Sequence, residues 1–201
     1  MLRSLIVLRP LNNNLVDFIP RRVLHISRAM SHTYRYPRPS ITVDTIIISE
    51  PQPSIPPQLL LIKRKNDPFK DCWALPGGFV DENEGLDAAA ARELQEETSV
   101  DPSTVDLIQV GSFGDPGRDP RGWTVTVAYA AIVPDTNLGV KAADDAADAQ
   151  WYDLKNLPLP LAFDHQMILC EAFKTMAQRF KEAEDKGGLK LMLKDASAKL
   201  S

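Results

Sequence analysis

The stretch GFVDENEGLDAAAARELQEETSV, residues 78–100, decides how the rest of the chain is interpreted. Its second half predicts a helix over residues 85–98, because an apolar residue recurs at every fourth position. The recurring residues are Leu86, Ala90 and Leu94. Three glutamates occupy the same predicted helix: Glu93, Glu96 and Glu97. At 100° per residue, offsets of three and four place their carboxylates within about 100° of arc, so the helix presents them together.

Three clustered carboxylates favour a divalent cation. Like charges at this spacing destabilise a helix slightly unless a cation lies among them. Mg²⁺ and Mn²⁺ both prefer hard oxygen ligands, so the sequence does not choose between them. A metal held in this way bridges phosphate oxygens and lowers the pKa of an attacking water. The alternative is a solvated, glutamate-rich helix surface without function, and the three glutamates alone do not exclude it.

The wider spacing of this stretch separates the two interpretations. Gly78 is followed after five residues by Glu84, and Glu84 after seven residues by the segment 92–100. This pattern matches the Nudix box, whose six fixed Gly, Glu and Arg positions would coincide by chance with a probability on the order of 10⁻⁵. The sequence therefore resembles the Nudix hydrolases. One position departs from the family pattern, because Ser99 stands where the family has glycine, but this change removes no metal ligand.

The resemblance implies a metal site and a reaction class. The implied metal ligands are the three glutamates and the carbonyl oxygen of Gly78. The implied catalytic residues are Glu93, Glu96, Glu97 and Arg92. Arg92 would hold a carboxylate in its productive rotamer by a bidentate contact, and Glu84 would be structural, near the helix N-terminus. The reaction would be cleavage of a diphosphate, with one glutamate or a carboxylate from a distant loop as general base.

The remaining pattern predicts strands on both sides of this segment. Runs of β-branched and apolar residues predict strands at 41–48, 59–63, 73–75, 105–113, 124–133 and 150–152. A long helix is expected over 164–186, before two glycines. Mixed elements in this order predict an α/β or α+β single domain, and the resemblance implies a Nudix α/β/α sandwich with a mixed β-sheet. Three aromatic residues are expected in the core rather than against substrate: Trp73, Trp151 and Phe163.

The loop 112–122 is the candidate for substrate binding. It resembles the corresponding loop of ADP-ribose pyrophosphatase-like Nudix proteins, as do residues 144–151 and 161–165. The candidate substrate-binding residues are Asp115, Arg118, Asp119 and Arg121. Guanidinium groups suit a diphosphate, and either aspartate would contact ribose hydroxyls. The alternative is a self-neutralising turn in which the arginines and aspartates form two salt bridges.

Three further polar residues have two interpretations each. Asp144 and Asp145 would supply an additional metal ligand or the general base, or else belong to a solvated loop. His165, at the start of the last predicted helix, is more often a capping or packing group than a functional one.

Composition limits the class of protein. The chain has 201 residues, 44% of them hydrophobic and 25% charged, which excludes collagen-like and wholly disordered chains. Two cysteines cannot form a disulfide framework. The apolar runs are far shorter than the ~20 residues of a membrane helix, so no membrane is expected as partner. Residues 41–201 carry a net charge of −10, which disfavours nucleic acid as a partner and suits divalent cations.

The first forty residues differ from the rest. They contain seven arginines, no lysine and a single acid, Asp17. This composition is typical of an organellar transit peptide, and an arm packed on the domain or a partner is the alternative. We therefore expect a transit peptide or disordered arm at 1–35, a Nudix domain at 36–186 and a C-terminal tail at 187–201. The location would be the mitochondrion or chloroplast, or the cytoplasm if translation starts at Met30.

The sequence thus predicts a metal-dependent hydrolase of a nucleoside diphosphate derivative. By the resemblance, the first substrate is ADP-ribose, cleaved to AMP and ribose 5-phosphate with Mg²⁺ or Mn²⁺. One alternative is a sanitiser of oxidised nucleoside triphosphates or a general dinucleotide pyrophosphatase. An alternative from another class is a ligand sensor without turnover, because a fold does not determine a function. The expected partner is a small nucleotide, and a homodimer is left open.

Overall fold

The computed structural model describes residues 34–143, 146–179 and 188–201. The predicted leader, apart from its last two residues, and both Asp144 and Asp145 lie outside these described residues, as does the end of the helix expected at 164–186. Each described helix falls short of the length and apolar character that a membrane crossing requires.

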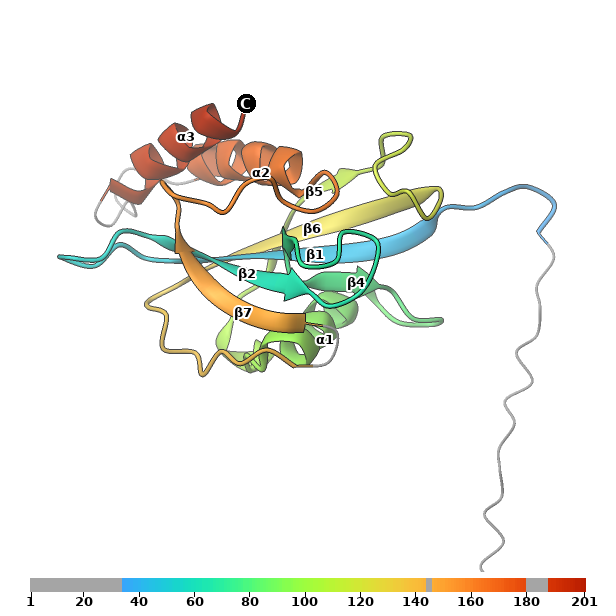
Figure 1. Ribbon diagram of the computed structural model, residues 1–201, viewed down its shortest axis with the longest axis horizontal. Helices are drawn as coiled ribbons and strands as arrows, with labels where there is room; N and C mark the ends of the chain where they lie inside the picture. The colour runs from blue at the N-terminus through green and yellow to red at the C-terminus, as the bar shows by residue number, and fades with distance from the viewer. Residues whose placement is uncertain (1–33, 144–145, 180–187) are drawn as a thin grey trace, which may run out of the picture. The chain divides into compact units, whose positions relative to one another are not determined.

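A seven-stranded sheet forms the middle of the described residues (Figure 1). Its strands are β1 (Ser40–Ser49), β2 (Gln58–Arg64), β3 (Trp73–Ala74), β4 (Gly77–Phe79), β5 (Ile108–Phe113), β6 (Thr124–Val133) and β7 (Ala146–Asp153). The order is β3-β2-β1-β6-β5, with β4 paired to β1 and β7 paired to β2. β1 runs parallel to β6, whereas the other pairs are antiparallel. The sheet is therefore mixed, as predicted.

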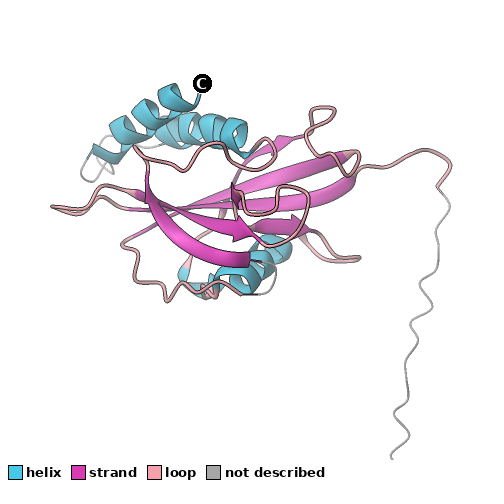
Figure 2. Ribbon diagram, in the orientation of Figure 1, coloured by secondary structure: helices cyan, strands magenta, loops and turns pink. Residues whose placement is uncertain are grey.

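Helices cover both faces of the sheet (Figure 2). On one face lies α1 (Leu86–Thr98), and on the other lie α2 (His165–Arg179) and α3 (Leu189–Leu200). A short 3₁₀ turn, Pro102–Thr104, follows α1. This arrangement confirms the expected α/β/α sandwich.

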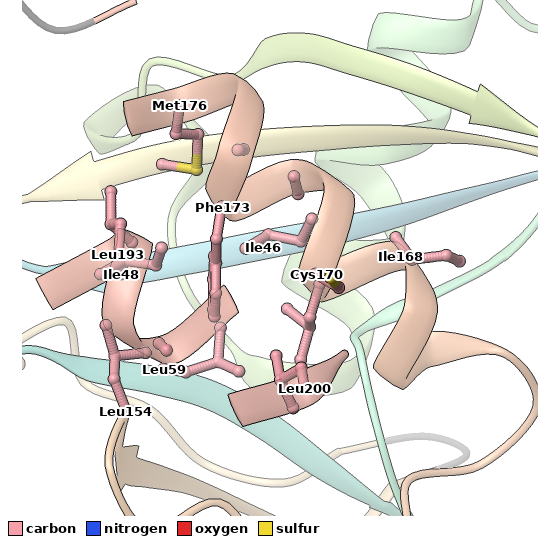
Figure 3. Close-up of a cluster of buried hydrophobic side chains, with 14 of the residues drawn as sticks. Ile46, Ile48, Leu59, Leu154, Ile168, Cys170, Phe173, Met176, Leu193 and Leu200 are labelled. Carbon is pink, nitrogen blue, oxygen red and sulfur yellow. The ribbon is translucent and has the colours of Figure 1, made fainter. Parts of the chain in front are cut away.

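The alternation of side chains along β1 builds both cores. Ile46 and Ile48 face α2 and α3 and pack with Phe173 and Leu193, as Figure 3 shows. Successive strand side chains point to opposite faces, so Ile47 packs instead in the cluster beneath α1. By the same alternation, Asp44, two residues before Ile46, lies on the α2 side of the sheet.

Two details of the predicted helices are wrong. Residues 187–201 were expected as a tail, but Leu189–Leu200 forms α3, whose Leu189, Leu193 and Leu200 share the largest buried cluster with α2. Their helical spacing gives α3 an apolar face that is buried rather than left in water. In α1, Ala90 and Leu94 are buried as predicted, whereas Leu86 is 37% exposed because it opens the helix.

The pairing of β1 positions the site. β1 meets β2 at Ile48↔Leu59, whereas its first half, Thr42 to Asp44, pairs with β4. The two glycines that open β4 therefore lie directly against β1, and α1 follows β4 in the chain. This arrangement brings residues from β1, β4 and α1 to one place.

Candidate active site

A cavity of about 320 Å³ opens where these elements meet. Its walls come from β1, β2, β4, α1, the 112–122 loop and the start of α2. The structure brings together most of the predicted site residues here: Gly78, Arg92, Glu93, Glu96, Glu97, Arg118, Asp119 and Arg121. Asp115 is exposed and lies outside the lining, so its predicted ribose contact has no support in the geometry.

Arg92 organises the acidic side of the cavity. Its Nε and Nη2 donate to the two carboxylate oxygens of Glu84, at 2.8 and 2.9 Å. Its Nη1 donates to Glu93 at 2.8 Å and to Glu96 at 2.9 Å. The hydrogen bonds from Arg92 and from the backbone N–H of Asp81 lower the pKa of Glu84 to about 2. The bidentate partner of Arg92 is therefore the structural Glu84, and the arginine positions Glu93 and Glu96 through its remaining nitrogen.

Glu97 is the most deeply buried of the three glutamates, at 6% exposure. It continues the buried face of α1 begun by Ala90 and Leu94, so helical spacing alone places it inward. Its Oε2 accepts the backbone N–H of Gly77 at 2.8 Å. Burial raises its pKa to about 8, and the charges of Glu93 and Asp44 add to the shift. A carboxylate held in this way favours a proton or another cation at its side.

The residues present fit a divalent cation. A methyl group added at Gly78 would lie 2.5 Å from Oε1 of Glu93, so the glycine leaves room for this carboxylate. Burial also raises the pKa of Glu93. Among the described residues, no three acidic, His or Cys side chains are already grouped as a metal centre, and Arg92 donates hydrogen bonds to both Glu93 and Glu96. The mutual repulsion of the buried carboxylates and their hard oxygen donors suit a cation of the Mg²⁺ or Mn²⁺ class.

The two arginines of the substrate loop have different roles. Arg118 is 5% exposed and makes a bidentate contact with Asp164, at 2.7 and 2.8 Å. Arg121 is 41% exposed and contacts the buried Asp119, at 2.7 Å. The self-neutralising alternative is thus correct for Arg121 and Asp119 but wrong for Arg118, whose partner lies outside the loop. Of the two guanidinium groups, that of Arg121 is the more accessible from solvent.

Aromatic side chains border the same part of the cavity. The guanidinium of Arg121 lies over the ring of Phe79 at 4.8 Å and near that of Phe163 at 5.3 Å. Trp73 and Trp151 pack against the buried clusters as predicted. Phe163 packs against a small cluster but also lines the cavity, with its backbone at a φ of 53°. The core interpretation of Phe163 was therefore incomplete.

Asp44 is a site residue that the sequence interpretation missed. It is 6% exposed, lies on β1 and lines the cavity. Thr126 of β6 donates to its Oδ2 at 2.6 Å, and Nε2 of His165 lies 3.5 Å from its Oδ1. The available signal was an acid within an otherwise β-branched strand, since an unpaired buried charge is costly. His165, expected as a capping or packing group, also lines the cavity.

The chain resembles known proteins over most of the described residues. Residues 39–171 match the family model for the NUDIX domain. An ADP-ribose pyrophosphatase of Methanocaldococcus jannaschii is 44% identical over 134 residues, which are 67% of this chain and 73% of that protein. An ADPR responsive transcriptional repressor of Acinetobacter baylyi is 43% identical over 141 residues, 69% of this chain and 54% of the repressor. This chain thus spans about half the length of the repressor.

A solved structure shows the same fold. The NUDIX domain of Shewanella oneidensis NrtR, determined as a cocrystal with ADP ribose, is 33% identical and superposes with a TM-score of 0.63. The match covers 70% of this chain and 90% of that domain.

Proposed function

The chain belongs to the Nudix family and is a pyrophosphohydrolase of that family, and on this premise we propose that it cleaves ADP-ribose to AMP and ribose 5-phosphate. Nudix hydrolases generally use divalent metal ions, and we propose Mg²⁺ or Mn²⁺ here. The observation that carries the proposal is the set of Arg92-organised glutamates beside a cavity, in a chain 44% identical to an ADP-ribose pyrophosphatase.

The residues on each wall of the cavity have a different role in the proposed reaction. The residues that would hold the cation are Glu93, Glu96, Glu97 and the carbonyl oxygen of Gly78. When bound, the cation would neutralise charge on the diphosphate and lower the pKa of the attacking water. A carboxylate of this group would take up the proton that the water loses. Arg121, facing the cavity from the opposite loop, would bind diphosphate oxygens.

The test is turnover of ADP-ribose by the whole chain and by residues 31–201, with products resolved by ³¹P NMR. We expect AMP and ribose 5-phosphate, and no products after chelation. Glu97→Gln should lower kcat by about 10² or more. Turnover of Glu97→Gln within tenfold of the unmodified chain would show that the catalytic assignment is wrong. A panel of oxidised nucleoside triphosphates and dinucleotides, compared by kcat/KM, separates the alternative substrates.

A ligand-responsive regulator is the second candidate function. It is favoured by one observation, the 43% identity to an ADPR responsive transcriptional repressor. Against it, every predicted metal-ligand side chain is present in the cavity wall. Calorimetry distinguishes the two: tight ADP-ribose binding without products over hours would favour the regulator.

We also propose import into an organelle, supported by the seven arginines and single acid among residues 1–40. Residues 1–35 fused to a fluorescent protein should direct it to mitochondria or chloroplasts. A chain starting at Met30 should stay in the cytoplasm, and cytoplasmic fluorescence from both would contradict the proposal.

A further inference from the structure

Asp44 presents one of its two carboxylate oxygens to the cavity. Its Oδ2 accepts the hydroxyl of Thr126 at 2.6 Å and has Nη2 of Arg118 at 3.9 Å. Its Oδ1 has a different neighbour, Nε2 of His165, at 3.5 Å. Because N–H···O hydrogen bonds in proteins are usually 2.7–3.2 Å long, the contact with His165 is too long to satisfy this oxygen. No shorter hydrogen bond to Oδ1 occurs among the described residues, so this acceptor is available to a ligand.

The hydrogen-bond partner of His165 determines which nitrogen of its imidazole carries the proton. Its Nδ1 accepts the backbone N–H of Leu75 at 2.9 Å, and a backbone N–H can only donate. Nδ1 therefore carries no proton, the ring is neutral, and the proton is on Nε2. Burial also lowers the pKa of His165, which agrees with a neutral ring. Nε2 is thus a hydrogen-bond donor directed toward the Asp44 side of the cavity.

Asp44 and His165 therefore form an acceptor and a donor 3.5 Å apart. One ligand atom can lie about 2.8 Å from both. To satisfy both, that atom must donate a hydrogen bond to the carboxylate and accept one from the imidazole. A hydroxyl does both, whereas a protonated or ring-conjugated amino group has no free lone pair for Nε2–H and a carbonyl oxygen has no proton for Oδ1.

We propose that Asp44 and His165 together bind one ribose hydroxyl of the substrate and make the site selective for that hydroxyl. The proposal rests on the proposed function, which supplies a ribose-containing substrate. Carboxylates bind ribose hydroxyls in other nucleotide sites for the same reason. The bidentate contact of Nε and Nη2 with Asp164 holds the guanidinium of Arg118 in place beside this pair.

Loss of the hydroxyl should be costly to binding. A substrate without it leaves the buried Asp44 oxygen and the His165 N–H unpaired, and hydrogen bonds to charged groups contribute enough for a loss on the order of 10²-fold in kcat/KM. A water molecule, which also donates and accepts, would fill the same place without making the site selective. The two cases differ in their response to substrate analogues.

The test measures kcat/KM of each protein variant for ADP-ribose and for ADP-ribose analogues that each lack one hydroxyl. In the unmodified chain, one analogue should lose about 10²-fold in kcat/KM relative to ADP-ribose. In Asp44→Ala and Asp44→Asn the loss for that same analogue should shrink to a few fold, because the partner of the hydroxyl is gone. Asp106→Asn, which changes an exposed aspartate outside the cavity, should keep the full selectivity.

Thermal unfolding of each variant controls for folding. A second variant, Thr126→Val, removes the hydrogen bond from Thr126 to Asp44 but keeps the Asp44 carboxylate and the His165 imidazole. It should reduce the selectivity only in part. Equal penalties for every analogue, or the same selectivity in Asp44→Asn as in the unmodified chain, would overturn the proposal. If ADP-ribose is bound but not hydrolysed, the proposed function fails, and calorimetry with the same analogues still decides on Asp44. Absence of any binding overturns both.

Discussion

Gly77 donates its backbone N–H to Oε2 of Glu97 at 2.8 Å, which joins strand β4 to helix α1 at the edge of the cavity. The next residue, Gly78, lies against the carboxylate of Glu93. Two consecutive glycines therefore each accommodate one glutamate of the helix. Their surroundings differ, because the space beside Gly77 is closed by backbone and the space beside Gly78 by a side chain.

Substitution by alanine should mainly affect activity at Gly78 and mainly affect stability at Gly77. In Gly78→Ala the new methyl group meets the flexible end of Glu93, so we expect a change in unfolding free energy below about 1 kcal/mol but a fall in kcat of about 10². In Gly77→Ala the methyl group meets the carbonyl oxygen of Val43 and the Cα of Asp44, and the free energy should fall by about 3 kcal/mol. Urea unfolding and ADP-ribose turnover check both. Full activity in Gly78→Ala would contradict the role of Glu93.

The sequence predicted the fold well where local patterns decide it. The strand at 41–48 and the helix at 85–98 are present, because a run of β-branched residues favours a strand and an apolar residue at every fourth position favours a helix. The prediction of a tail at 187–201 is wrong although the segment contains a helical signal. Leu189, Leu193, Ala196 and Leu200 recur at helical spacing and form the buried face of α3.

The candidate site was predicted in part for a related reason. The glutamates and Arg92 lie within two turns of one helix, so spacing alone brings them together. The partner of Arg118 lies 46 residues away in the chain, and Asp44 meets Thr126 at a separation of 82 residues. Such pairings depend on the strand order and the start of α2, which no local pattern contains.

The raised pKa of Glu97 predicts a pH dependence of the metal-free protein. The folded chain keeps a proton on Glu97 up to about pH 8, whereas the unfolded chain releases it near the ordinary glutamate pKa. Between these values the folded state binds more protons, so the free energy of unfolding should fall as the pH rises, by about 1 kcal/mol per unit. Urea unfolding at several pH values, with chelator present, measures the slope.

The control for this prediction is Glu97→Gln, which cannot titrate and should show a flatter profile over the same range. Added Mg²⁺ should also flatten the profile of the unmodified chain, because a cation beside the carboxylate replaces the proton. Identical slopes for the unmodified chain and Glu97→Gln would show that this carboxyl group is not protonated in the folded state.

Arg92→Lys tests whether the hydrogen-bond geometry of Arg92 or only its positive charge matters on the acidic side of the cavity. Lysine keeps the charge but cannot contact both oxygens of Glu84 and reach Glu93 and Glu96 as well. We expect kcat for ADP-ribose to fall about tenfold or more, because the glutamates lose their fixed directions. Lys174→Arg, on the exposed part of α2, is the matched control and should have no effect. Activity of Arg92→Lys equal to that of the unmodified chain would show that charge alone suffices.

Arg118 and Arg121 provide a matched pair of substitutions in one loop. Arg118→Met removes the cation between the half-buried Asp164 and the buried Asp44, and leaving these two carboxylates without it should cost about 3 kcal/mol of unfolding free energy. Arg121→Met should cost about 1 kcal/mol, because the Arg121 side chain is 41% exposed and the substitution leaves the hydrogen bond from the backbone N–H at this position to Asp119. Its main effect should be a KM for ADP-ribose raised about tenfold, through the lost diphosphate contact. Urea unfolding and steady-state kinetics separate the two outcomes. A larger loss of stability in Arg121→Met than in Arg118→Met would reverse the assignment of the structural and the substrate-binding arginine.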